Sequence, residues 1–224
     1  MQSFNNKMLR FFQTLWPAEE KPIVLGEGNT DHPPVMLIGE APGEQESLQG
    51  RPFVGKAGKN LDGFLRVLAL NREDIYISNV VKIRPTKVSE KGRVSNRPPN
   101  KEELALFTPY LMEEILRVHP QTIVTLGNFA LKALCGPKAV IGDMHGKPTQ
   151  VTVKHEKQEA EFAVFPLYHP ASIIYNRSLQ SVYDEDLLAL KEALEGRLNE
   201  MLPVVTQLGG TGGKEVGLES GFLI

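Results

Sequence analysis

Short apolar runs alternate with segments of helical hydrophobic spacing along most of the 224-residue chain. Runs rich in β-branched and aromatic residues predict strands, and apolar residues three and four positions apart predict amphipathic helices. The expected strands are Val35–Ile38, Ile75–Val81, Thr122–Leu126 and Phe162–Phe165, with Val151–Val153 as an edge or hairpin strand. Such alternation is typical of a parallel sheet covered by helices on both faces. We therefore expect an α/β fold, a three-layer α/β/α arrangement around a central, mainly parallel four-stranded sheet.

Helices are expected between and around these strands. They cover residues near 2–16, 57–70, 100–118, 128–134 and 182–198. The segment Lys82–Pro99 is polar and basic and contains several Pro and Gly residues, so we expect a long loop there. No linker divides the chain, so a single domain over residues 1–200 is expected, followed by a Gly-rich tail over residues 201–224.

The composition excludes several classes of protein. A single cysteine, Cys135, excludes an internal disulfide and an all-cysteine metal or iron–sulfur cluster within one chain. The sequence has no secretory signal and no apolar run long enough to span a bilayer, so we expect a cytoplasmic protein with no membrane partner. The net charge of −2 is not typical of a protein that coats nucleic acid, although a local basic patch remains compatible with it.

Polar side chains occur where three of the expected parallel strands end. Glu40 follows the first strand, Asn79 lies near the end of the second, and His169 follows the fourth. Ligands of open parallel sheets bind beyond the carboxyl ends of the strands. The sequence therefore predicts that a carboxylate, an amide and an imidazole converge on one rim of the sheet.

These residue types fit the cleavage of a glycosidic bond. An ionised Glu40 can orient a water molecule or stabilise a developing cation, and the Asn79 amide can donate and accept side by side. His169 can donate to an oxygen that gains charge, while Phe53 offers a flat face on which a base can stack. The combination suits a reaction in which a base departs as an anion and the sugar becomes cationic.

Several motifs, in order, carry a resemblance to a known family. The stretch Gly39–Asp62 reads GEAPGEQESLQGRPFVGKAGKNLD, and the other matching segments are Gly26–Asn29, Ile77–Lys82 with Arg84–Pro85, Asn96–Pro99, Leu126–Gly127 and Tyr168–Ser172. Together they resemble the uracil-DNA glycosylase superfamily, and most closely its family 4 branch. The resemblance covers about Gly26 to Leu194.

The resemblance implies a role for particular residues. It makes Glu40 and His169 catalytic. The residues implied in base binding are Ala41 and Gly43 through the backbone, Glu46 as a gate against thymine, Phe53 by stacking and Asn79 by reading the base edge. The resemblance also implies a DNA contact by Ser172 after the histidine, and Arg177 lies close to where the family commonly has an Arg. The charge of the basic loop beside the site adds Lys82, Arg84 and Arg97 as expected phosphate contacts.

The chain also departs from the family. Family 4 proteins usually hold a [4Fe–4S] cluster with four cysteines, but here the N-terminal region has none, and Ile83 and Phe107 stand at or near the other two places. Cys135 matches none of them, so no cluster and no other metal or cofactor is expected. The loop Lys87–Asn96 contains no histidine, so the covalent trapping of DNA known in a related branch is not expected. Ser47 stands where an Asp is common.

The expected function is removal of uracil from DNA by hydrolysis of its N-glycosidic bond after base flipping. The expected partner is uracil-containing DNA, and we expect a monomer. Two alternatives remain open: a nucleic-acid-binding module that keeps the pocket without the activity, and a different small-molecule hydrolase on the same scaffold. The preferred base and the preference for single or double strands are also left open.

Overall fold

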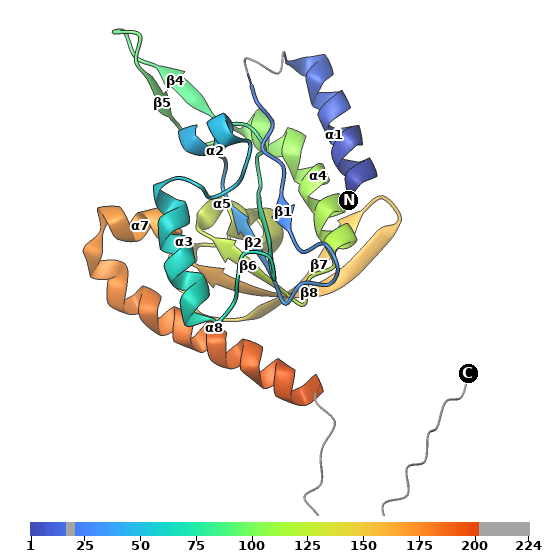
Figure 1. Ribbon diagram of the computed structural model, residues 1–224, viewed down its shortest axis with the longest axis vertical. Coiled ribbons are helices and arrows are strands. Elements are labelled where there is room, and N and C mark those ends of the chain that lie inside the picture. Colours follow the sequence, from blue (N-terminus) through green and yellow to red (C-terminus); the bar gives the residue numbers. More distant parts are fainter. Residues whose placement is uncertain (17–20, 202–224) are drawn as a thin grey trace, which may run out of the picture.

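The computed structural model describes residues 1–16 and 21–201, and side chains only as far as residue 196 of the last helix. Within these residues the centre is a six-stranded sheet in the order β1–β3–β2–β6–β8–β7 (Figure 1). The strands are β1 (Glu27–Gly28), β2 (Val35–Gly39), β3 (Tyr76–Asn79), β6 (Thr122–Leu126), β7 (Thr149–His155) and β8 (Gln158–Leu167). The four inner strands are parallel, as predicted, and the two edge strands β1 and β7 add antiparallel pairs.

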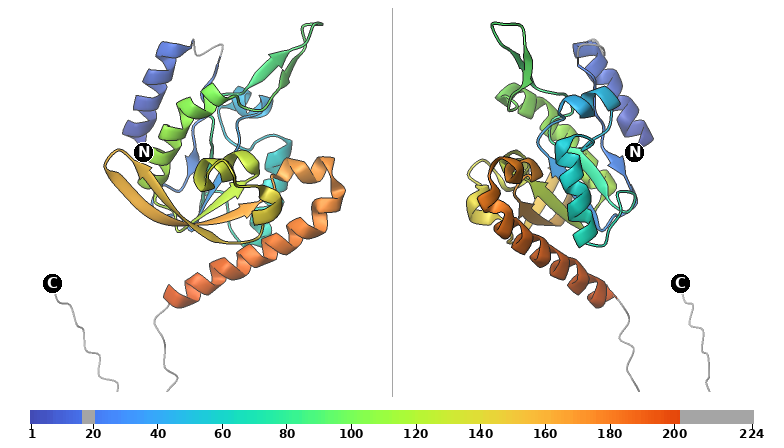
Figure 2. Two further views of the ribbon diagram at one scale, coloured as in Figure 1. Left: turned by 180° about the vertical axis from the view of Figure 1, so that it is seen from behind. Right: turned by 60° about the vertical axis from the view of Figure 1, so that its left-hand side comes forward.

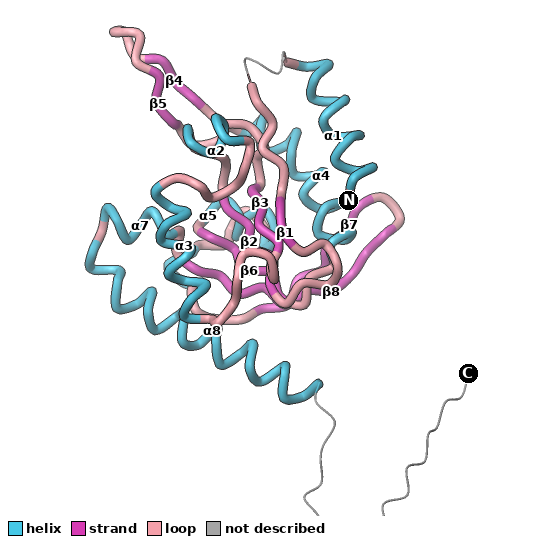
Figure 3. The backbone as a smooth tube through the Cα atoms, in the orientation of Figure 1, coloured by secondary structure: helices cyan, strands magenta, loops and turns pink. Residues whose placement is uncertain are grey.

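Helices surround this sheet (Figure 3). They are α1 (Gln2–Leu15), α2 (Glu44–Gln49), α3 (Lys56–Val67), α4 (Lys101–Val118), α5 (Asn128–Cys135), α6 (Ile141–Met144), α7 (Pro170–Tyr175) and α8 (Gln180–Met201), with a 3₁₀ helix, η1 (Arg177–Leu179). The predicted helices are confirmed. The sequence did not predict α2, α6 and α7, because helices of four to six residues are too short to show a hydrophobic period.

Alternate residues of the inner strands face two separate cores, because successive side chains of a strand point to opposite faces. In β2, Met36 and Ile38 pack with buried residues of α1 and α4, whereas Val35 and Leu37 pack with those of α3 and α8. The views of Figure 2 show these helices on opposite sides of the sheet. The three layers predicted from the sequence are thus observed.

The segment predicted as a loop instead contains a hairpin of β4 (Thr86–Val88) and β5 (Val94–Asn96). Val88 pairs with Val94, and Gly92 adopts a φ of 74° in the turn, which glycine tolerates without strain. The hairpin projects from the body beside α2 (Figure 1). Strands of three residues between charged neighbours carry too little alternation to be recognised in the sequence.

Two predictions concern membrane spans and the C-terminal tail. None of the helices in the described residues has the length and apolar character needed to cross a membrane. The predicted Gly-rich tail over residues 201–224 lies outside the described residues, except for Met201 at the end of α8.

Candidate active site

A cavity of about 580 Å³ lies where β2, β3 and β8 end. It is bounded by the loop after β2, the start of α3, one strand of the β4–β5 hairpin and α7. The predicted site residues that line it are Ala41, Gly43, Glu46, Phe53, Asn79, Arg84 and His169. The tertiary structure thus brings together side chains from segments that lie far apart in the sequence.

The floor of this cavity depends on close backbone packing at Gly39. Gly39 and Asn79 are register partners at the ends of the parallel strands β2 and β3. A Cβ on Gly39 would lie 2.6 Å from the Phe53 ring and would clash with the Asn79 side-chain oxygen. Only glycine therefore lets both the Asn79 side chain and the Phe53 ring lie this close to the strand end.

His169 is held in one tautomer at the start of α7. Its Nδ1 accepts a hydrogen bond of 3.1 Å from the backbone N–H of Ala171. A backbone amide can only donate, so Nδ1 carries a lone pair and Nε2 carries the ring proton. Burial lowers the pKa of His169 to about 4, an effect that the negative charge of Glu46 partly opposes. At neutral pH the ring is thus an uncharged donor through Nε2.

Phe53 forms the aromatic wall of the cavity. Its buried ring stacks on the His169 ring, with the centroids 5.9 Å apart and the planes inclined by 30°. Its backbone has a φ of 53°, in the left-handed region that non-glycine residues rarely adopt. Such conformations cost about 1–3 kcal/mol and persist only where the surroundings enforce them. The residues that hold the backbone of Phe53 in this conformation therefore help to shape the cavity.

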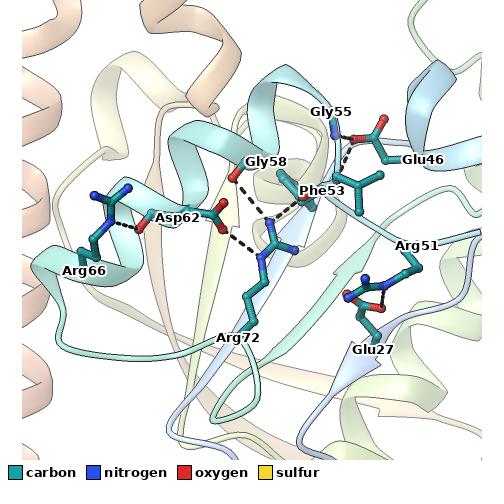
Figure 4. A network of polar contacts seen from close by, with 10 residues as sticks. Glu27, Glu46, Arg51, Phe53, Gly55, Gly58, Asp62, Arg66 and Arg72 are labelled. Carbon is teal, nitrogen blue, oxygen red and sulfur yellow. Dashed lines mark hydrogen bonds and ion pairs between the residues drawn. The ribbon is translucent and has the colours of Figure 1, made fainter. Parts of the chain in front are cut away.

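Glu46 connects the start and the end of the loop between β2 and α3 through hydrogen bonds. Its carboxylate accepts hydrogen bonds from the backbone amides of Gly43 at 3.1 Å, Val54 at 3.0 Å and Gly55 at 2.7 Å. Figure 4 shows its bonds on the Gly55 side of the loop. Glu46 lines the cavity, where the sequence predicted a gate, and in addition it fixes the loop backbone.

Glu40 follows β2 and is half-buried. Burial raises the pKa of its carboxyl group to about 6. It is not among the residues that line the cavity, although its neighbour Ala41 is. The position next to the wall and the raised pKa suit a group that exchanges a proton near neutral pH.

The prediction that Lys82 contacts DNA is wrong. Its side chain is fully buried, and its ammonium group donates to Glu114 at 2.6 Å, Ser78 Oγ at 2.5 Å and the carbonyl of Asn79 at 2.7 Å. The hydroxyl of Tyr76 donates to the same Glu114 carboxylate at 2.9 Å. Lys82 therefore belongs to a buried polar network beneath the strand end that carries Asn79.

Two arginines of the predicted basic loop hold the base of the hairpin. Arg84 lines the cavity, donates to Asn96 at 2.7 Å and pairs with Glu44 at 3.3 Å. Arg97 donates two bonds of 2.7 Å to the Glu103 carboxylate, and this pairing lowers the pKa of that carboxyl group. These contacts connect the hairpin to α2 and α4, so the hairpin leaves the body from a fixed base.

The remaining predicted contacts lie outside the cavity. Ser172 donates its backbone N–H to the His169 carbonyl at 2.8 Å in the first turn of α7, and Arg177 is exposed in η1. The sequence did not single out Lys56 or Tyr175 as site residues, yet both line the cavity. Lys56 lies within the long first motif, which was a usable signal, whereas only the turn of α7 brings Tyr175 to the cavity.

Comparison with known proteins identifies a matching family and similar sequences. The model of the Uracil DNA glycosylase superfamily matches residues 25–194. A type-4 uracil-DNA glycosylase of Saccharolobus solfataricus is 38% identical over 188 residues, which cover 82% of this chain and 81% of that protein. One of Thermotoga maritima is 37% identical, with 77% and 83% covered. The crystal structure of Pedobacter heparinus SMUG2 has a TM-score of 0.49 at 15% identity, covering 75% of this chain and 77% of that one.

Proposed function

The chain belongs to the uracil DNA glycosylase superfamily, and from this premise we propose that it hydrolyses the N-glycosidic bond of uracil in DNA. Relatives named type-4 uracil-DNA glycosylases share 35–38% of its sequence over most of its length. One structural observation carries the proposal: a single cavity places a stacking ring, an amide and a neutral imidazole donor together. These are the groups that would hold a pyrimidine and take up its charge.

The base reaches these groups only outside the duplex stack. A nucleotide flipped out of the helix would place its base in the cavity, against the ring of Phe53. The amide of Asn79 would then pair with the edge of uracil, donating to one carbonyl and accepting from the ring N–H. The backbone at Ala41 and Gly43 would line the rest of the base.

The bond that breaks joins the sugar C1′ to the base N1. Its electron pair passes to the base, and the Nε2–H of His169 donates to the O2 that gains negative charge. The ionised carboxylate of Glu40 stabilises the cationic sugar and orients a water molecule. The water oxygen bonds to C1′, and its proton passes to Glu40, whose raised pKa suits that transfer.

Contacts to the DNA backbone are assigned to groups around the cavity mouth. Arg84 lines the cavity, and Arg97, Ser172 and Arg177 lie on the adjoining hairpin base, α7 and η1. The hairpin adds exposed cations, among them Lys87. Positive groups here would attract phosphates and hold the duplex in register without reading its sequence.

The residues present do not fit an iron–sulfur cluster. The resemblance implies four cysteine ligands, but the chain has one cysteine, Cys135. Within the described residues, no group of three or more His, Cys, Asp or Glu could hold a metal ion. Ile83 and Phe107, which stand at or near two of the ligand places, are both buried in the core that includes residues of α1 and α4.

We propose that aromatic packing between α1 and α4 stabilises the region in which other family members hold the cluster. Phe12 of α1 stacks on Phe107 of α4 with ring centroids 4.4 Å apart, and Trp16 lies parallel to Phe12 at 5.9 Å. Such pairs stabilise by about 0.5–1.5 kcal/mol beyond their buried area. The purified protein is expected to contain no stoichiometric iron or sulfide and to keep its activity after chelation. Stoichiometric iron, or activity lost to the chelator, would contradict the proposal.

One assay tests the function. Oligonucleotides that carry uracil, hypoxanthine or xanthine, in single and double strands, are incubated with wild-type protein and with Asn79→Ala. Release of uracil by the wild-type protein and its loss in the variant are expected. Binding of uracil-containing DNA without release would instead support the non-catalytic module. We expect a monomeric protein acting in the cytoplasm, and light scattering tests the first of these expectations.

A further inference from the structure

The peptide bond between Phe53 and Val54 is held at both of its polar ends. Its carbonyl accepts a hydrogen bond of 2.5 Å from Nη2 of Arg72, and its N–H donates at 3.0 Å to the carboxylate of Glu46 (Figure 4). A cation thus binds the oxygen and an anion binds the amide of one peptide unit. Charge-assisted bonds of this kind are about twice as strong as neutral ones.

This peptide unit decides where the Phe53 ring lies. Phe53 has a left-handed backbone φ of 53°, and the orientation of the following peptide is set by its ψ. In this conformation the ring stacks on His169. A left-handed phenylalanine that lost one of its two anchors would relax toward the ordinary regions of backbone space.

Arg72 is itself fixed in place. Its Nε donates to the Asp62 carboxylate at 2.9 Å, and its Nη2 also approaches the Gly58 carbonyl at 3.4 Å. Gly58 lies so close to the Phe53 carbonyl that an added Cβ would clash with it. The planar guanidinium therefore bridges the first turns of α3 and the loop that precedes it, a geometry that a lysine cannot reproduce.

Arg72 acts from outside the cavity. It lies in the turn between α3 and β3, and it is not among the residues that line the cavity. It reaches a cavity-lining residue through its hydrogen bond to the Phe53 carbonyl. Its influence on the site must pass through the backbone of Phe53.

We propose that Arg72 is a positioning residue that holds Phe53 in its stacking conformation for the flipped base. The proposal rests on the proposed function, because it takes the Phe53 ring as the surface on which uracil stacks. Arg72 would thus contribute to base binding without lining the cavity. Glu46 provides the opposite anchor of the same peptide.

Single-turnover release of uracil tests the proposal in Arg72→Ala, with Arg66→Ala as the matched control. Arg66 is an exposed arginine of α3 that donates to the backbone of Asp62 without touching Phe53. Arg72→Ala is expected to slow release by about 10- to 100-fold, since a small misplacement of a binding group has effects of that size. Arg66→Ala is expected to match the wild type. Equal rates in all three proteins would overturn the proposal.

A double-mutant cycle separates positioning from general loss of structure. In a Phe53→Leu background, Arg72→Ala should slow release by less than about twofold, because effects that act through one residue are not additive. A purely structural role would instead slow release by the same factor in both backgrounds. Arg72→Lys, which keeps the charge, replaces the alanine variant if that one does not fold.

A second readout does not depend on activity. With 4-fluorophenylalanine placed at position 53, the fluorine resonance of the DNA-free protein should shift or broaden in Arg72→Ala and stay unchanged in Arg66→Ala. An unchanged resonance in Arg72→Ala would reject the positioning role even if the enzyme were active. If the wild-type protein released no uracil while Arg72→Ala still shifted the resonance, the proposed function would be rejected. The role of Arg72 in holding Phe53 would stand.

Discussion

The floor and the rim of the cavity are built in opposite ways. The floor consists of buried strand ends around Gly39 and Asn79, supported from below by the fully buried pair of Lys82 and Glu114. The rim consists of the exposed β4–β5 hairpin, which is attached through the partly exposed pair of Arg97 and Glu103. Buried polar groups tolerate little displacement, whereas exposed charges are screened and interchangeable. We therefore expect chemistry and stability to depend on the floor, and DNA affinity to depend on the rim.

The largest effect is expected from His169 and Glu40, which lie beside the floor and are proposed to act on the reacting atoms. His169→Ala or Glu40→Gln should slow uracil release by about a thousandfold, because each removes a group that stabilises charge only in the transition state. Single-turnover rates at saturating enzyme measure the loss, and unchanged DNA affinity shows that binding is intact. A loss of less than tenfold would show that the floor does not carry the chemistry.

The support beneath the floor should appear as stability. Lys82→Met leaves the carboxylate of Glu114 buried without its cation, which costs about 3 kcal/mol of unfolding free energy. Urea unfolding measures this change. The double variant Lys82→Met with Glu114→Leu should recover much of the loss, since removing both charges leaves no unpaired ion. If the single variant were as stable as the wild type, the network would be no more important than the rim.

A smaller effect is expected from pH. The pKa of Glu40, raised to about 6 by burial, means that its active carboxylate form is lost as pH falls through that value. Uracil release should then fall about tenfold per pH unit below about 6. The pKa of His169, lowered to about 4, keeps its ring neutral over that range. The residual activity of His169→Ala should fall at low pH in the same way, because Glu40 is still present. A rate of uracil release that stayed constant down to pH 5 would show that no carboxylate with a pKa of about 6 is needed.

The smallest effect on rate is expected from the rim. The double variant Lys87→Ala with Lys91→Ala should leave single-turnover release unchanged at saturating protein, but should weaken DNA binding and reduce its dependence on salt. The matched control, Lys154→Ala with Lys157→Ala, removes the same charge from the exposed β7–β8 hairpin. Binding isotherms at several salt concentrations compare the two. An equal salt slope in both double variants would show that the β4–β5 hairpin makes no phosphate contacts.

Much of this site was predictable because its parts follow strand ends. Asn79 and His169 close two parallel strands, and the topology of such sheets brings their ends to one edge. Phe53 and the glycines around it lie in one continuous motif, so they could be assigned together. Local order in the chain was enough to place these groups around one cavity.

The environment of individual charges was not predictable in the same way. Lys82 and Arg84 are two positions apart in one basic segment, yet the first is fully buried and the second faces the cavity. The difference depends on Glu114, which meets Lys82 across 32 positions of sequence. A local pattern contains no information about a partner that a distant helix supplies.

The sequence by itself determined the layered α/β fold, the edge of the sheet that carries the cavity and the lack of cysteine ligands, because periodicity, motif order and composition are local properties. Only the tertiary structure decided which charges are buried, that Glu46 and Arg72 hold one peptide from opposite sides, and that Phe53 adopts a left-handed conformation. Burial and strain arise from contacts between segments that only the folded chain brings together.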